Sequence, residues 1–252
     1  MEKTKFAAII PARYASSRFP GKPLALLGGF PMIIHVCRRV SEVIPDVAVA
    51  TDDSRIFDCV EQHGFRACMT SDKHRSGTDR VAEAAGKAAP NADVIINVQG
   101  DEPFIAAEQL RLLMGCFNDP ETDIATLARR FDPALGFEAL FDANLVKVTF
   151  ADNGRALYFS RSIIPYVRGV KHTEWLKTTD FYAHVGIYAY RRETLRQITQ
   201  TPQASLENAE SLEQLRWLQN GLSIRVAVTE TPTIGIDTPE DLTQAEKMLG
   251  KL

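Results

Sequence analysis

Residues 6–23 read FAAIIPARYASSRFPGKP, an apolar run of strand length that leads directly into a loop carrying three cations. The run Phe6–Ile10 is apolar at every position, as expected for a strand of a parallel sheet that helices cover on both faces. The loop places Arg13, Arg18 and Lys22 within ten residues. Ligands of open α/β sheets bind outside the carboxyl ends of the strands, and clustered cations with exposed backbone N–H groups there suit a polyphosphate. Charge alone fits a solvated surface loop equally well, but the position after a strand favours an anion site.

Further along the chain, apolar runs of strand length alternate with segments of helical periodicity, which predicts successive βαβ units. The predicted elements are, in order, Phe6–Ile10, Pro31–Val43, Val47–Ala50, Arg55–His63, Ala67–Met69, Asp79–Ala88, Val94–Val98 and Ala107–Phe117. Pro31 suits a first helical position, Thr78 an N-cap and Gly64 the residue just after a helix. We therefore expect an α/β fold with one sheet that helices cover on both faces.

The pattern changes after about residue 140, where Val146–Phe150, a turn at Asp152–Gly154 and Ala156–Phe159 predict an antiparallel hairpin. Ser205–Asn220 has the periodicity of one amphipathic helix, and residues 238–241 (TPED) are typical of a capped helix start. The other predicted segments are a polar loop at Arg168–Asp180 and strands at His184–Tyr190 and Ile224–Val228. We expect a single domain over residues 1–252, with an insertion at about 140–190 that serves substrate binding and subunit contact.

The composition limits the classes of partner. The 252 residues are 45% hydrophobic, which allows a sizeable core, and a net charge of -3 gives a pI near 6.0. Binding to nucleic acid or to an anionic membrane therefore has no support from the whole-chain charge. No stretch approaches the roughly 20 consecutive apolar residues of a spanning helix, and no signal peptide is visible, so we expect a cytoplasmic protein. Cys37, Cys59, Cys68 and Cys116 have no C-x-x-C spacing, which predicts reduced structural thiols.

The loop after the first strand matches neither common phosphate-binding fingerprint. Position 16 is Ser where a Walker A loop needs Gly, Pro23 follows the lysine, and G-x-G-x-x-G is absent. P-loop ATPases and dinucleotide dehydrogenases are therefore disfavoured. A second loop, Asp72–Arg80, again follows a strand and opens a helix, so that Ser76, Gly77 and the first helical amides are placed to read a base or a phosphate. A capped helix start without a ligand is the alternative for this loop.

Acidic residues follow two of the predicted strands. Residues 97–103 begin as a buried strand and continue through Gly100 into Asp101 and Glu102. Mg²⁺ in phosphoryl-transfer sites is typically held by one or two carboxylates, while substrate phosphates complete its coordination. Asp101 is the better ligand candidate because Gly100 lets the backbone come close, and Asp237 after the last strand can converge on the same cation. A surface turn and an ordinary helix cap are the alternatives for these two acids.

Six blocks of the sequence, in this order along nearly the whole chain, resemble the bacterial 3-deoxy-manno-octulosonate cytidylyltransferases. They are ARYASSRFPGKP (12–23), HRSGTDR (74–80), NVQGDEP (97–103), ALYFSR (156–161), HVGIY (184–188) and LEQLR (212–216). The resemblance implies a Rossmann-like nucleotidyltransferase sheet. It also implies an enzyme that transfers CMP from CTP to the acid sugar 3-deoxy-manno-octulosonate (Kdo), giving CMP-Kdo and pyrophosphate and activating Kdo for lipopolysaccharide synthesis. The sequence departs little from the pattern of that family. Phe19 stands where an aliphatic residue is expected, Asp79 stands where Glu is frequent, and Phe104 stands where Met is usual.

The resemblance also implies roles for individual residues. The CTP phosphates would be contacted by Ala12, Arg13 and Lys22, and the cytidine by Ser76, Gly77, Arg80 and Gln99. Mg²⁺ would be held by Asp101 and Asp237, and the catalytic residues would be Arg13, Lys22, Asp101 and Asp237. The sugar acid would be bound by Arg161, His184, Tyr188, Glu213 and Gln214. A homodimer is implied too. From the net charge and the lack of a spanning stretch, we expect neither nucleic acid nor a membrane as a partner.

These assignments give a coherent mechanism, in which the anomeric hydroxyl of Kdo attacks the α-phosphorus of CTP in line and pyrophosphate leaves. A guanidinium fork binds a carboxylate bidentately, so Arg161 is the natural partner of the acid group. His184 fits a hydrogen-bonding residue of the pocket better than a general base. The rival interpretations are a CMP-sialic acid synthetase, a sugar-1-phosphate nucleotidyltransferase and a nucleotide-binding regulatory module without turnover. The presence of both Asp101 and Asp237 argues against the last of these.

Overall fold

Two units make up the chain. The computed structural model describes residues 4–15, 18–74 and 76–249, so Ser16, Ser17 and Arg75 of the two predicted loops lie outside the described residues. The first unit comprises Met1–Arg111, Ala189–Thr199 and Thr233–Leu252, and the second comprises Leu112–Tyr188 and Gln200–Pro232. The second unit contains most of the predicted insertion, while the prediction of one domain over residues 1–252 stays a prediction.

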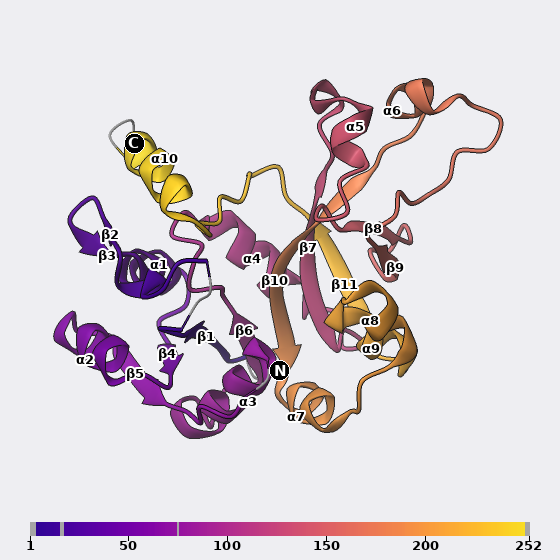
Figure 1. Ribbon diagram of the computed structural model, residues 1–252. Coiled ribbons are helices and arrows are strands. Elements are labelled where there is room, and N and C mark those ends of the chain that lie inside the picture. Colours follow the sequence, from indigo (N-terminus) through magenta and orange to yellow (C-terminus); the bar gives the residue numbers. More distant parts are fainter. Residues whose placement is uncertain (1–3, 16–17, 75, 250–252) are drawn as a thin grey trace. The chain divides into compact units, whose positions relative to one another are not determined.

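The first unit is built on a parallel sheet in the order β6-β1-β4-β5 (Figure 1). Its strands are β1 (Phe6–Ala12), β4 (Val47–Thr51), β5 (Arg66–Met69) and β6 (Val94–Asn97). Its connecting helices are α1 (Met32–Ser41), α2 (Ser54–Gln62) and α3 (Gly77–Ala88). Crossovers between parallel strands are right-handed, so α1 and α2 cover one face of this sheet and α3 covers the other. β4 and β6 are buried along their whole length, which explains their continuous apolar runs.

Smaller elements complete the first unit. They are a 3₁₀ turn (Lys22–Leu24), the two-stranded hairpin β2 (Leu26–Leu27) and β3 (Phe30–Pro31), α7 (Arg192–Gln200) except its last residue, and α10 (Pro239–Leu249). The boundary between the two units falls inside α4 (Ala107–Cys116), after Arg111. α10 packs on the hairpin through a buried cluster of Leu27, Met32, Ile236 and Ala245. The predicted cap of α10 is confirmed, because Thr238 Oγ1 accepts the N–H of Asp241 at 3.2 Å and Asp241 Oδ2 accepts the N–H of Thr238 at 2.9 Å.

The second unit combines a parallel pair of strands with an antiparallel insertion. Its strands are β7 (Ile124–Arg130), β8 (Lys147–Phe150), β9 (Ala156–Ser160), β11 (Ile224–Val228) and most of β10 (Tyr182–Arg191). β11 pairs in parallel with β7, which lies beside β10, and β8 pairs antiparallel with β9 and β10. Its short helices are α5 (Phe137–Leu140), α6 (Trp175–Thr178), α8 (Ser205–Glu210), α9 (Glu213–Gln219) and 3₁₀ turns at Pro133–Leu135 and His172–Glu174. The predicted α/β class with an inserted hairpin is confirmed.

Three local predictions differ from the structure. The N-cap of α3 is Ser76, whose Oγ accepts the N–H of Asp79, so the prediction of Thr78 as the cap is wrong by two residues. Pro31 precedes α1 as its extended N-cap rather than occupying the first helical position. The single helix predicted over Ser205–Asn220 is two helices, because Ser211 adopts a left-handed φ of 51° that ends α8. Gly64 does follow α2, with a φ of +78°.

The state of the cysteines agrees with the prediction of reduced thiols. All four cysteines are free thiols. Burial raises the pKa of Cys37 to about 12 and that of Cys116 to about 11, so neither forms a thiolate near neutral pH. Among the residues that the structure describes, no helix has the length and apolar character needed to cross a membrane.

Candidate nucleotide and sugar-acid sites

Two carboxylates of the first unit converge on one ammonium group. Lys22 Nζ lies 2.6 Å from Asp101 Oδ2 and 3.1 Å from Asp237 Oδ1, and Arg18 Nη2 lies 3.2 Å from the other oxygen of Asp237. Asp101 is also fixed through its backbone, because its carbonyl accepts the N–H of Ile236 at 2.9 Å. Residues far apart in the sequence are therefore brought together beyond the carboxyl ends of β1 and β6.

The glycine before Asp101 is required by close packing. A Cβ at Gly100 would lie 2.9 Å from the carbonyl oxygen of Pro11 in β1, a distance that side chains essentially never reach. The neighbouring Glu102 is a weaker ligand candidate, because burial and the adjacent Asp101 raise its pKa to about 7. The described residues contain no group of three or more His, Cys, Asp or Glu side chains that could hold a metal. Any cation here would depend on Asp101 and Asp237, with other ligands from substrate or water.

Arg13 and Ala12 lie where β1 ends. Ala12 is the last residue of β1 and is almost fully buried. Arg13 Nη2 donates to the carbonyl of His74 at 2.6 Å, which ties the loop after β1 to the loop before α3. Among the described residues, no carboxylate forms an ion pair with Arg13, so its positive charge stays available for an anionic ligand.

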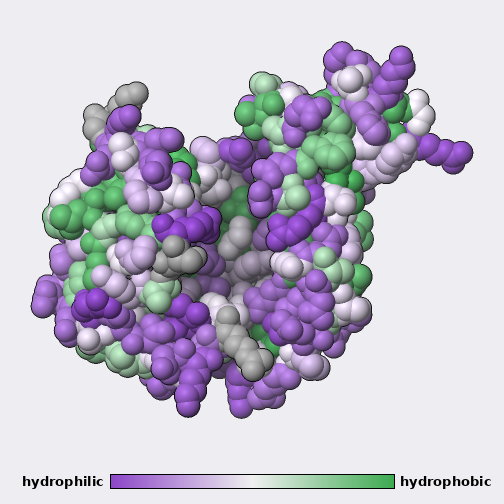
Figure 2. Space-filling model, viewed as in Figure 1, coloured by the Kyte–Doolittle hydropathy of each residue, from purple (hydrophilic) through white to green (hydrophobic). Residues whose placement is uncertain are grey.

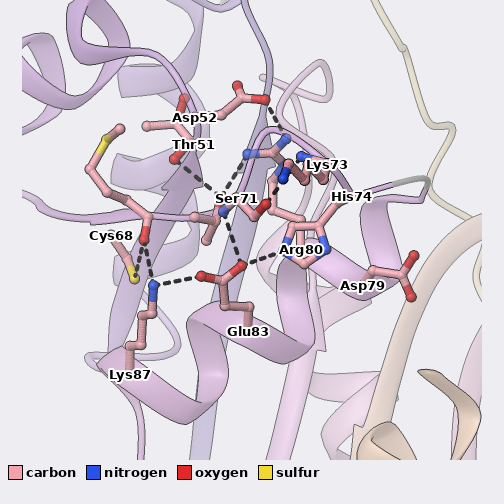
Figure 3. Close-up of polar contacts among 12 residues, drawn as sticks. Thr51, Asp52, Cys68, Ser71, Lys73, His74, Asp79, Arg80, Glu83 and Lys87 are labelled. Atoms are coloured by element: carbon pink, nitrogen blue, oxygen red, sulfur yellow. Dashed lines mark hydrogen bonds and ion pairs between the residues drawn. The ribbon is translucent and has the colours of Figure 1, made fainter. Parts of the chain in front are cut away.

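The loop before α3 is anchored by Glu83 (Figure 3). Glu83 accepts the N–H of Ser71 at 3.0 Å, pairs with Lys87 Nζ at 2.5 Å and contacts the ring of His74. The hydrogen bond from Lys87, followed by those from Ser71 and His74, lowers the pKa of Glu83 to about 2 despite partial burial. The charged carboxylate of Glu83 thus holds Ser71 and His74 in place, and the carbonyl of His74 in turn accepts a hydrogen bond from Arg13. The spacing of the sequence gives no sign of this role.

The predicted cytidine residues occupy different environments. Ser76 and Asp79 form a capping box at the start of α3, so this loop does contain a capped helix start. Gly77 opens that helix, and Gln99 follows β6 with a partly exposed side chain. Arg80 is fully buried, with Nη2 at 2.6 Å from Asp52 (Figure 3) and Nη1 at 2.6 Å from Thr70 Oγ1. The guanidinium of Arg80 therefore links α3 to the residues after β4 and β5, and a direct cytidine contact through it stays a prediction.

In the second unit, Arg161 is held by backbone carbonyls. Its Nε, Nη1 and Nη2 donate to the carbonyls of Glu210 at 2.6 Å, Ala143 at 2.9 Å and Ser211 at 3.3 Å. Glu210 also accepts the backbone N–H of Arg161 at 2.7 Å through its side chain. No described carboxylate forms an ion pair with the guanidinium, which leaves its charge available for an acid group of a ligand.

The other predicted sugar residues lie on β10 and α9. His184 and Tyr188 are four residues apart on β10, so they project from the same face, and their ring centroids are 5.4 Å apart. Tyr188 contacts Trp217 of α9 edge-on at 5.1 Å. At the start of that helix, Glu213 pairs with Arg216 at 2.6 Å and Gln214 is buried. The link from Arg161 to Ser211 joins this group, so all five residues belong to one region of the second unit.

Burial decides the protonation state of His184. Loss of solvent lowers the pKa of His184 to about 3, so the ring is neutral at physiological pH. A neutral imidazole of such low basicity is a poor general base and a good hydrogen-bonding group. The place of His184 in a sugar-acid pocket stays a prediction.

Comparison with known proteins shows the class of enzyme to which the chain is similar. The family model described as Cytidylyltransferase matches residues 7–224. A 3-deoxy-manno-octulosonate cytidylyltransferase of Parabacteroides distasonis is 57% identical over 96% of this chain and 96% of its own length, and one of Thermodesulfovibrio yellowstonii is 48% identical over 96% of each. The solved structure of a CMP:2-keto-3-deoxy-manno-octonic acid synthetase complexed with CTP is 41% identical, covers 98% of this chain and 99% of that one, and has a TM-score of 0.89.

The chain therefore belongs to the 3-deoxy-manno-octulosonate cytidylyltransferase family. A solved glucose-1-phosphate thymidylyltransferase from Bacillus anthracis is only 17% identical, with a TM-score of 0.66, and shares the fold alone.

Proposed function

We propose that this chain transfers CMP from CTP to Kdo, giving CMP-Kdo and pyrophosphate and so activating Kdo for lipopolysaccharide synthesis. The convergence of Asp101 and Asp237 on a single cationic atom carries the proposal, because a nucleotide-binding module without turnover has no need of it. The names of the relatives, and the solved synthetase in complex with CTP, support this choice of nucleotide and acceptor.

The nucleotide is assigned to the first unit. Arg13 and Lys22 would bind the phosphates and offset the charge that builds up on the departing pyrophosphate. Ala12, Ser76, Gly77 and Gln99 would present backbone groups and small or amide side chains to the nucleotide. Arg80 would act from behind them, because its guanidinium is buried between Asp52 and Thr70.

We propose Mg²⁺ as the cofactor, held by Asp101 and Asp237. The residues fit this ion, because both carboxylates reach one cationic centre at 2.6 and 3.1 Å and supply the hard oxygen ligands that Mg²⁺ prefers. When bound, the ion would polarise the α-phosphate and favour ionisation of the attacking hydroxyl. Lys22 would then exchange its carboxylate partners for the phosphates of CTP.

The sugar acid is assigned to the second unit. Arg161, already held in place by three carbonyls, would pair with the carboxylate of Kdo. His184, Tyr188, Glu213 and Gln214 would bond to its hydroxyl groups. The anomeric oxygen forms the new bond to the α-phosphorus as the bond from that phosphorus to pyrophosphate breaks, so no protein nucleophile is required.

The deciding experiment measures pyrophosphate release from CTP by the purified chain. Kdo, sialic acid and a sugar-1-phosphate are compared as acceptors, with Mg²⁺ and with a chelator. Release that needs both Kdo and Mg²⁺ is the expected result. Release with sialic acid alone would reassign the sugar pocket, and CTP binding without release from any acceptor would favour the regulatory module.

We also propose a cytoplasmic homodimer. Near α5 in the second unit, Leu135, Phe141 and Tyr166 are 58%, 60% and 70% exposed, and Figure 2 shows hydrophobic atoms gathered there. Exposed apolar groups in one place are typical of a subunit contact. Light scattering at micromolar concentration should give twice the mass of the 28.0 kDa chain, and Phe141→Glu should halve it. A monomeric parent protein would contradict the proposal.

A further inference from the structure

A buried threonine contacts the predicted sugar-binding histidine. Thr126 lies in the middle of β7 and is 0% exposed. Its hydroxyl oxygen lies 2.9 Å from His184 Nε2, 2.8 Å from the carbonyl of Ile187 and 3.2 Å from the carbonyl of Val185. All three neighbours belong to β10, the strand beside β7. The hydroxyl group therefore has three polar partners and one proton to give.

The direction of each hydrogen bond follows from the chemistry of these groups. A carbonyl oxygen only accepts, so the threonine proton goes to the backbone, with Ile187 as the nearer acceptor. If the proton went to the imidazole instead, lone pairs of the hydroxyl would face two carbonyl oxygens at 2.8 and 3.2 Å. The contact with the histidine is consequently one in which Nε2–H donates and Thr126 Oγ1 accepts.

The ring of His184 is also held from its sides. Phe159 meets it edge-on with centroids 5.1 Å apart, and Tyr188 lies against it at 5.4 Å. With the proton on Nε2, Nδ1 carries a lone pair, and among the described residues no hydrogen-bond donor is recorded for it. A neutral imidazole in this state offers one acceptor and cannot serve as a cation for the acid group.

We propose that Thr126 is a positioning residue that fixes His184 with its proton on Nε2, so that Nδ1 accepts a hydrogen bond from a hydroxyl group of the sugar-acid substrate. The assignment of the substrate rests on the function proposed above, whereas the position of the proton does not. Arg161 and His184 would then divide recognition between them, with the arginine reading the carboxylate and the histidine reading a hydroxyl.

The position of the proton is tested without substrate. In the full chain labelled with ¹⁵N-histidine, two-bond ¹H–¹⁵N correlation spectra at neutral pH show which ring nitrogen is protonated. We expect a proton on Nε2 of His184, and faster exchange of that proton with water in Thr126→Val. A proton on Nδ1, or on both nitrogens, would overturn the inference even if the enzyme were fully active.

The role in binding is tested by steady-state kinetics. Thr126→Val keeps the shape but removes the acceptor, and loss of one neutral hydrogen bond should raise KM for Kdo about three- to tenfold while KM for CTP stays unchanged. Thr126→Ser restores the hydroxyl and should return KM for Kdo to within about twofold of the parent value. Thr122→Val is the matched control, because Thr122 is 1% exposed in the same unit and its hydroxyl donates to the carbonyl of Cys116 at 2.9 Å.

The outcomes distinguish the positioning role of Thr126 from the proposed function of the enzyme. An unchanged KM for Kdo in Thr126→Val, or an equal rise in Thr122→Val, would refute the positioning role. If Thr126→Val does not fold, KM for Kdo in Thr126→Ser and the spectrum of the parent protein still decide the question. A parent enzyme that is inactive with Kdo but has the proton on Nε2 would refute the proposed function alone.

Discussion

The replacement Asp52→Asn should destabilise the first unit far more than a surface ion pair would. Asp52 is the charged partner of Arg80, whose side chain is 0% exposed, at 2.6 Å. Removal of one partner of a fully buried ion pair costs about 3–5 kcal/mol. Asp52 keeps 20% exposure, and Thr70 still accepts a hydrogen bond from Arg80, so we expect a loss of about 2–3 kcal/mol in the free energy of unfolding.

Urea denaturation followed by far-UV circular dichroism measures this loss. Circular dichroism is the suitable probe because both tryptophans, Trp175 and Trp217, lie in the second unit. Asp46→Asn is the matched control, since Asp46 pairs with Arg66 in the same unit but the two side chains are 42% and 45% exposed. The control should lose less than about 1 kcal/mol. Equal losses in the two variants would refute the argument that burial of Arg80 sets the cost.

Three further predictions follow from the same contacts. The pKa of Glu83 is lowered from 4.5 to about 2, so its ionised carboxylate contributes about 2 kcal/mol to the free energy of unfolding, after allowance for partial exposure. This contribution is complete above pH 4.5 and is lost as the pH falls toward 2. Urea denaturation should therefore show the difference between the parent protein and Glu83→Gln shrinking over that range, and a constant difference would contradict the charge argument. Lys147→Met, which removes an ammonium bonded to three carbonyls at 2.6–3.0 Å, should cost about 2–3 kcal/mol in urea and raise KM for Kdo, because one of those carbonyls belongs to Arg161. Asp101→Ala should lower pyrophosphate release by orders of magnitude while its circular dichroism stays that of the parent, and near-normal release would refute the metal assignment.

Sequence reasoning succeeded where the geometry of the sheet dictates the outcome. The carboxyl ends of parallel strands lie along one edge of a sheet, so the loops that follow β1 and β6 meet there, and Lys22 of the first loop reaches Asp101 of the second. The hairpin at β8 and β9 was equally predictable, because Asp152–Gly154 supplies turn residues between two strand-length runs.

The features that escaped prediction depend on contacts between distant segments or on single backbone angles. Arg80 follows a helix cap and is typical of an exposed helical residue, and only the fold reveals its partner Asp52, which lies 28 positions earlier. The apolar stripe of Ser205–Asn220 runs through Ser211 without interruption, and periodicity carries no information about one left-handed residue. Thr126 and Glu83 act by fixing other residues, so no motif marks them.

Because the helix is interrupted at Ser211, two backbone carbonyls that could continue a helix bind a side chain of the predicted sugar-acid site instead. In an unbroken helix, the carbonyls of Glu210 and Ser211 would accept N–H groups four residues further along. The left-handed residue releases both oxygens, and they bind the guanidinium of Arg161 instead. Substitutions that make this segment a better helix would therefore loosen Arg161, so thermal stability and affinity for an acidic substrate would change in opposite directions.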